Sequence, residues 1–193
     1  MVHTCGNLGM RGLSSHKKYC NVSFSFRKKL LDKENGASAV GGISLMSPSP
    51  TVVRMLNDYF HRSRMHESIL FGDKVQTFYR LLFKKELYYS SKYARVKKRN
   101  SFTIMYQIEN GHNKYGLIYY FVYICNVPLV IVMDLIPAQR CFILPDGHGV
   151  PIIPVSIGAL TIINVNSIVE KCVFVEFDHV MYVIPFPCKF LSD

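Results

Sequence analysis

An uncharged run of 19 residues, from Tyr115 to Met133, constrains the fold of this chain more than any other feature. Its length is close to the ~20 apolar residues that a membrane-spanning helix requires. Asn126 and Pro128 interrupt the run, and its composition favours Val, Ile, Tyr and Phe, which are strand-forming residues. The run therefore predicts two strands joined by a short turn at Asn126-Val127-Pro128, with a membrane span as the alternative.

Short apolar segments with the period of a strand continue on both sides of this run. Residues 101–107 are rich in strand formers, and Asn110-Gly111 behind them is a strong turn signal. Many short strands between turns predict a mainly β (α+β) fold, namely a small antiparallel β-barrel or sandwich with one or two short N-terminal helices. Further strands are expected at 115–124, 129–136, 172–177 and 180–185. Residues 75–83 have apolar residues at helical spacing, but their composition favours a strand, with a helix as the alternative.

A short helix is expected where the β-rich part begins. Ser49 can cap it, Pro50 suits the first helical position, and the apolar residues of 50–60 fall on one face. We therefore place the domain boundary near Ser49, which gives a β-rich domain with an N-terminal helix over residues 49–193.

Residues 1–48 have the composition of a flexible basic N-terminal arm followed by a linker. Residues 1–31 contain six Lys/Arg, four Ser and no acidic residue. Residues 33–50 mix Gly, Ser, Ala and Pro with little charge, which is typical of a linker.

The charge of the chain is concentrated in its first half. Residues 1–100 hold 19 Lys/Arg and 6 Asp/Glu, whereas residues 101–193 hold 4 Lys/Arg and 7 Asp/Glu. The balance of +13 in one half and −3 in the other gives the net charge of +10. Such asymmetry predicts a polyanionic partner for the basic half, either nucleic acid or an anionic membrane surface, with a solvated lysine-rich surface as the alternative.

The densest group of cations lies at residues 92–99, with aromatic residues interleaved around it. Lys and Arg neutralise phosphates while Tyr and Phe offer stacking faces, a combination that is expected of a nucleic-acid surface. A basic loop between two strands would have the same composition. The candidate contact residues are Lys92, Tyr93, Arg95, Lys97, Lys98, Arg99 and Phe102.

Catalytic and metal-binding patterns are weak in this sequence. Cys5, His16 and Cys20 fall short of the four closely paired ligands of a structural zinc site. Neither a G-x-S-x-G elbow nor a phosphate-binding P-loop occurs. The sequence therefore predicts a non-enzymatic protein with no catalytic residue, no metal and no cofactor.

Three segments follow one another in a recognisable order: LYYSSKYARVKKRNSFTIMYQ, KYGLIYYFV and SIVEKCVFVEFDHVMYVIPFPCKFLSD. Together, over about residues 44–193, they resemble the uncharacterised C-terminal region of transposon-derived (CACTA-type transposase-associated) proteins of invertebrate genomes. The stretch SIVEKCVFV is also similar to bromo-adjacent homology modules. The resemblance implies an interaction domain without the catalytic carboxylates of a transposase core.

The sequence thus predicts a transposon-derived interaction domain that binds nucleic acid (DNA or RNA) or a nuclear protein through its basic half. Lys97-Lys98-Arg99 is short enough to serve as a nuclear-import signal, so a nuclear or cytoplasmic location is expected. One alternative is a small membrane-associated protein with residues 115–133 in the bilayer, and another is a decayed fragment without function. No small-molecule substrate is predicted.

Overall fold

The chain divides into two units after Leu30, and all the residues described below belong to the second unit. The basic arm predicted for residues 1–31 and the residues weighed as zinc ligands, Cys5, His16 and Cys20, lie outside the described residues. The computed structural model describes residues 36–65, 68–70, 72–93, 102–124, 127–138 and 151–185.

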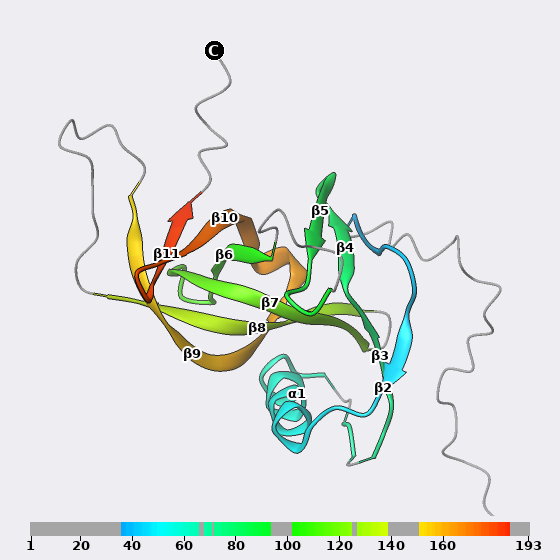
Figure 1. Cartoon of the computed structure of the whole chain (residues 1–193). Coiled ribbons are helices and arrows are strands. Elements are labelled where there is room, and N and C mark those ends of the chain that lie inside the picture. Colours follow the sequence, from blue (N-terminus) through cyan, green and yellow to red (C-terminus); the bar gives the residue numbers. More distant parts are fainter. Residues whose placement is uncertain are drawn as a thin grey trace, which may run out of the picture. The chain divides into compact units, whose positions relative to one another are not determined.

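Six antiparallel strands form a closed barrel (Figure 1). Around the ring they are β6 (Thr103–Gln107), β7 (Asn113–Ile124), β8 (Val127–Pro137), β9 (Ile153–Asn164), β11 (Val180–Pro185) and β10 (Ile168–Phe177). The pairing of β7 with β8 closes the ring, and a turn of 3-10 helix, η2 (Val165–Ser167), connects β9 to β10. The predicted mainly β fold, a small antiparallel barrel with a short helix, is confirmed.

Two further groups of strands extend this barrel. β3 (Val75–Phe78) pairs with β7, and β2 (Ser44–Met46) pairs with β3 at the edge of the same sheet. A separate three-stranded sheet consists of β1 (Ala37–Ala39), β4 (Arg80–Phe83) and β5 (Glu86–Tyr89).

The prediction of a linker over residues 33–50 is wrong for β1 and β2, which lie inside that range and belong to the two sheets. The small residues of this segment resemble a linker in composition, yet they suit a strand that packs closely against its neighbours. Ala37, opposite Phe83 of β4, is 1% exposed. The neighbouring strands therefore override the local composition.

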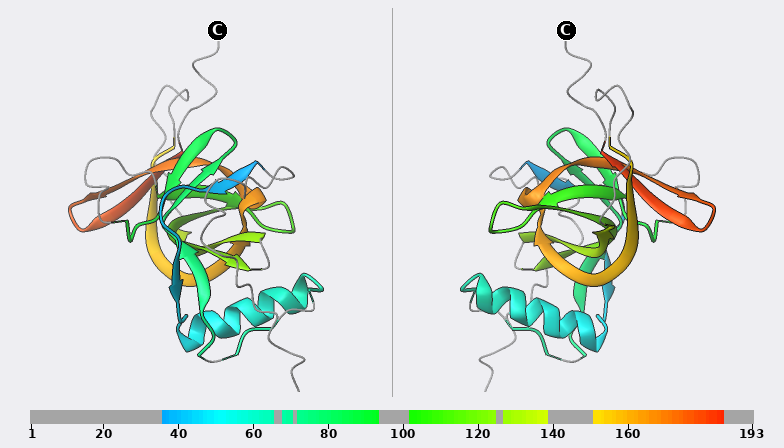
Figure 2. Two further views of the ribbon diagram at one scale, coloured as in Figure 1. Left: turned by 90° about the vertical axis from the view of Figure 1, so that its right-hand side faces the viewer. Right: turned by 90° about the vertical axis from the view of Figure 1, so that its left-hand side faces the viewer.

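The predicted helix is confirmed as α1 (Pro50–Arg62), the α-helix among the described residues. Ser49 caps it, because its Oγ accepts a hydrogen bond from the Val52 N–H at 3.4 Å. The apolar face of the helix lies against the outside of the barrel, as both views of Figure 2 show. The cluster between them contains Val52, Val53, Leu56 and Phe60 of α1 with Tyr120, Val122, Ile124, Leu129, Ile131 and Ile162 of the barrel.

The uncharged run over residues 115–133 forms most of β7 and β8, so its division into two strands is confirmed. The turn is shorter than predicted, because Val127 and Pro128 already belong to β8 and pair with Ile124 and Tyr123. The pairing of β8 with β9 begins only at Leu129, so Pro128 is paired on one side alone, where proline is tolerated. Within the ranges that the structure describes, no helix is both long and apolar enough to span a membrane.

The interior of the barrel is filled by apolar side chains and is continuous with the core of the three-stranded sheet. Buried residues of β1, β4 and β5 join the cluster formed by the inward-facing residues of β6, β7 and β8. The three-stranded sheet is therefore fixed to the barrel by the burial of one of its faces. The joining residues are Ala37, Leu81, Phe83 and Tyr88.

Candidate nucleic-acid interface

Strand β7 changes its partner along one edge, and the residue at the change holds the candidate interface in place. Residues 113–117 pair with β6, and residues 121–123 pair with β3. Between them, the Ile118 carbonyl accepts a hydrogen bond from the Ser91 N–H at 2.7 Å, and the Ile118 N–H donates to the Phe102 carbonyl at 2.7 Å. The chain on either side of the predicted basic segment is thus bonded to one residue of the barrel.

A compact turn positions the two site residues that come first in the chain, Lys92 and Tyr93. Ser90 is fully buried, and its N–H donates to the Tyr79 carbonyl at 2.9 Å. The Lys92 N–H donates to Ser90 Oγ at 3.0 Å, and the Tyr93 N–H donates to the Ser90 carbonyl at 3.0 Å. These hydrogen bonds fix the backbone of Lys92 and Tyr93, so the positions from which their side chains project are also fixed.

Cations and aromatic rings alternate beside this turn. The Arg80 guanidinium carbon lies 5.1 Å from the centroid of the Tyr93 ring, which in turn lies 5.6 Å from the centroid of the Tyr89 ring. The Lys92 ammonium lies 4.6 Å from the centroid of the Tyr119 ring on β7. Both distances from a cation to a ring are within the range of cation–π attraction. We call these five residues the cation–aromatic surface.

The cation–aromatic surface is accessible to solvent and carries positive charge. Lys92 is exposed, and the other four side chains are half-buried, so each keeps part of its area free for a ligand. The acidic residue of the β4–β5 hairpin, Glu86, forms an ion pair with Lys171 at 3.0 Å. Because a lysine already neutralises Glu86, this carboxylate offsets little of the charge of Arg80 and Lys92.

Arg80 is held in position by a close contact with the backbone of Gly41. A Cβ atom at Gly41 would overlap with Arg80 Nη2, and Gly41 has a φ of +94°, which other residues rarely adopt. Arg80 also lies opposite Tyr89 in the pairing of β4 with β5. The guanidinium is therefore positioned by two neighbouring segments of the chain.

The structure brings together only part of the predicted contact residues. Lys92 and Tyr93 belong to the cation–aromatic surface, whereas Phe102 is half-buried and packs against the interior core. The sequence did not single out Arg80 or Tyr119 for the site, because β4 and β7 are brought beside the turn only by the pairing of strands. The remaining candidates lie outside the described residues and are Arg95, Lys97, Lys98 and Arg99.

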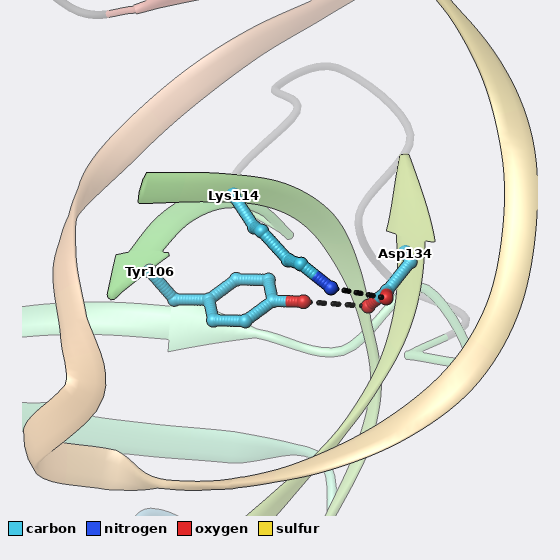
Figure 3. A network of polar contacts seen from close by, with 3 residues as sticks. All are labelled: Tyr106, Lys114 and Asp134. Carbon is cyan, nitrogen blue, oxygen red and sulfur yellow. Dashed lines mark hydrogen bonds and ion pairs between the residues drawn. The ribbon is translucent and has the colours of Figure 1, made fainter. Parts of the chain in front are cut away.

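A second polar group joins a buried tyrosine of the barrel to a half-buried aspartate and an exposed lysine (Figure 3). The hydroxyl of the fully buried Tyr106 donates to Asp134 Oδ1 at 2.6 Å, and Lys114 Nζ lies 3.6 Å from Asp134 Oδ2. Burial, together with the hydrogen bond to Asp134, raises the pKa of Tyr106 far above its ordinary value. Tyr106 therefore stays protonated and donates to the carboxylate, which is a structural arrangement rather than a reactive one.

The described thiol is equally unsuited to nucleophilic chemistry. Cys172 is 1% exposed, and burial raises its pKa to about 12. A thiol must ionise to attack an electrophile, so at neutral pH this residue acts as a small apolar side chain.

No protein-family model, curated protein or solved structure matches the chain. The resemblance to transposon-derived proteins and to bromo-adjacent homology modules therefore stays a prediction.

Proposed function

We propose that the protein binds single-stranded nucleic acid through the cation–aromatic surface. The observation that carries this proposal is that two cations each lie over a tyrosine ring, Arg80 over Tyr93 and Lys92 over Tyr119, and that the Tyr89 ring lies beside that of Tyr93. Proteins that bind single strands combine cations that neutralise the phosphates with aromatic rings on which the bases stack. Both chemical groups are present here at defined positions.

The rings favour single strands over duplexes. A base can stack on Tyr89 or Tyr93 only when its own face is free, and in a duplex the faces are covered by neighbouring bases. The two tyrosines are attached to a hairpin and a hydrogen-bonded turn, so little conformational entropy is lost when they receive a base. DNA and RNA single strands both meet these requirements.

The basic segment next to the surface supports the same proposal through its charge. Arg95, Lys97, Lys98 and Arg99 follow Tyr93 directly in the sequence, before Phe102. Ser91, before this segment, and Phe102, after it, are both bonded to Ile118. The sequence thus adds positive charge directly after Tyr93, which suits a nucleic-acid ligand.

Fluorescence anisotropy with labelled oligonucleotides at several salt concentrations tests the proposal. We expect a single strand to bind more tightly than a duplex of the same sequence, and the affinity to fall steeply with salt because bound counterions are released. Tyr93→Ala should weaken single-strand binding about 5- to 150-fold, which corresponds to the ~1–3 kcal/mol of one stacked base.

Arg62→Ala is the matched control, because it removes one exposed cation at the end of α1, beside the β6–β7 turn. It should leave the affinity nearly unchanged. The triple variant Lys97→Glu, Lys98→Glu, Arg99→Glu should remove most of the binding without unfolding the domain. Equal binding by wild type and the Tyr93→Ala variant, or no binding of any oligonucleotide by wild type at low salt, would contradict this function.

A further inference from the structure

The β4–β5 hairpin ends in a turn whose two central residues are both lysines. Phe83 pairs with Glu86, so Lys84 and Lys85 alone connect the strands. Their φ angles are 49° and 65°, in the left-handed region. A two-residue turn with positive φ at both positions is the type I′ turn, for which Asn-Gly is strongly preferred and lysine is uncommon.

The β10–β11 hairpin has the same kind of turn with different residues. Phe177 pairs with Val180, and Asp178 and His179 between them have φ angles of 49° and 61°. Asp and His are enriched in the left-handed region, because a short polar side chain is tolerated there. Local backbone preference thus helps to explain the Asp-His turn but gives no reason for two lysines in the other.

The lysine turn lies on the same ribbon as part of the cation–aromatic surface. Leu81, Phe83 and Tyr88 face the core, whereas Arg80 and Tyr89 lie on the opposite face at the base of the hairpin. Lys84 and Lys85 are both exposed at its tip, about 13 Å along β4 from Arg80 at ~3.3 Å per residue. Figure 1 shows this hairpin beside the barrel, with β7 running past its base.

We propose that Lys84 and Lys85 contact the phosphates of the same single strand and so extend the cation–aromatic surface to the tip of the hairpin. This inference rests on the proposed function. It identifies the part of the ligand that the tip of the hairpin would contact, namely the phosphate backbone of the strand, whatever its base sequence. Lys84 Nζ lies 4.9 Å from the centroid of the Phe83 ring, a cation–π contact within the hairpin, and the residue is exposed. Backbone strain persists where the surrounding structure or a function supports it, and here two lysines stand in place of the less strained Asn-Gly pair.

The proposal predicts opposite effects of one substitution on stability and on binding. In the double variant K84N/K85G, a favoured turn sequence replaces the two lysines, so the melting temperature should rise by about 2–4 °C. The same variant loses two phosphate contacts, so the log–log slope of single-strand affinity against salt should become about 1.4 units shallower.

Two variants serve as controls for this experiment. D178N/H179G makes the equivalent change in the β10–β11 turn, and we expect it to raise the melting temperature while the salt slope stays that of wild type. K84R/K85R keeps both charges at the tip, and we expect wild-type binding from it.

The outcomes separate this inference from the proposed function. If wild type binds single strands but K84N/K85G shows the wild-type slope, the tip makes no phosphate contact and the inference fails while the function stands. If wild type binds no oligonucleotide at low salt, both fail. A melting temperature that rises for D178N/H179G but not for K84N/K85G would overturn the claim that the lysine turn is strained.

Discussion

The barrel interior and the cation–aromatic surface are built from the same residue types and use them in different ways. Inside, the hydroxyl of Tyr106 donates to the carboxylate of Asp134, and the exposed Lys114 forms an ion pair with the same carboxylate, so the tyrosine acts through its hydroxyl and the lysine has a counter-charge. Outside, the Tyr93 ring lies beside the Arg80 guanidinium, so the tyrosine acts through its ring and the charge stays available. A tyrosine or lysine whose polar group is paired with a carboxylate stabilises the fold, whereas a tyrosine ring beside a cation that has no carboxylate nearby is suited to a ligand.

The largest expected effect falls on the interior. Tyr106→Ala removes a fully buried ring and leaves Asp134 without its hydrogen-bond donor, so we expect a loss of about 3–5 kcal/mol in the free energy of unfolding. Urea denaturation measures this loss. The protein that remains folded should bind single strands with the affinity of wild type. A lower affinity of the folded variant would show that the barrel interior and the cation–aromatic surface do not act independently.

Alkaline pH should also destabilise the fold through groups that are buried within it. Burial raises the pKa of Cys172 from 9.0 to about 12 and that of Tyr120 from 10.0 to about 12. The unfolded chain therefore loses these protons first, so the stabilisation is complete below pH 9 and is lost as pH rises from about 9 to 12.

At about 1.4 kcal/mol per pKa unit, the two groups together predict a loss of about 4 kcal/mol by pH 11. Urea denaturation at pH 8, 9, 10 and 11 measures it. In the Cys172→Val variant the decline should begin nearer pH 10, where the tyrosines alone contribute. A free energy of unfolding that stays constant up to pH 11 would contradict the burial of these groups.

A smaller effect is expected at Gly116, which lies opposite Asp134 in the pairing of β7 with β8. A Cβ atom there would overlap with Val132 Cγ1 and would lie 3.0 Å from the Met133 carbonyl oxygen. Gly116→Ala should therefore cost about 1–3 kcal/mol through overpacking. Gly42→Ala, where an added Cβ meets no atom within 4 Å, is the control in the same denaturation assay.

The smallest effect on stability is expected at the surface. Lys92→Ala removes one exposed cation over the Tyr119 ring, which should change the free energy of unfolding by only about 0.5 kcal/mol. Its salt slope for single-strand binding should nevertheless become about 0.7 units shallower. A large loss of stability with an unchanged salt slope would mean that Lys92 stabilises the fold and does not contact the phosphates, which contradicts the role that we assign to the cation–aromatic surface.

The elements that could be predicted from the sequence are those whose apolar residues recur clearly with the period of a strand or of a helix. β6, β7, β8 and β11 fall in this class, as does α1 with its cap. β9 was not predicted, because Pro154 and Gly158 interrupt its apolar pattern. Gly158 is explained only by the fold, since a Cβ there would lie 3.1 Å from Asp134 Cβ on the neighbouring strand β8.

The candidate site, like the fold, could be predicted from the sequence only in part. Lys92 and Tyr93 are adjacent in a segment that is conspicuous for its charge, so composition was sufficient to identify them. Arg80 and Tyr119 lie in apolar strands, and their role depends on strand pairings that a linear pattern does not encode. The strain of the lysine turn is likewise visible only in the backbone angles.

The seam between β6 and β10 has a consequence for how the chain is synthesised. β6 pairs with β7 immediately, but its other edge waits for Ile168–Lys171 of β10, about 60 residues later in the chain. At ~5–20 residues per second the ribosome needs several seconds to supply that partner, and an unpaired strand edge recruits other chains during such intervals. β10 covers this edge of β6, and the ring is complete only when β11, the last strand, has paired with β9 and β10.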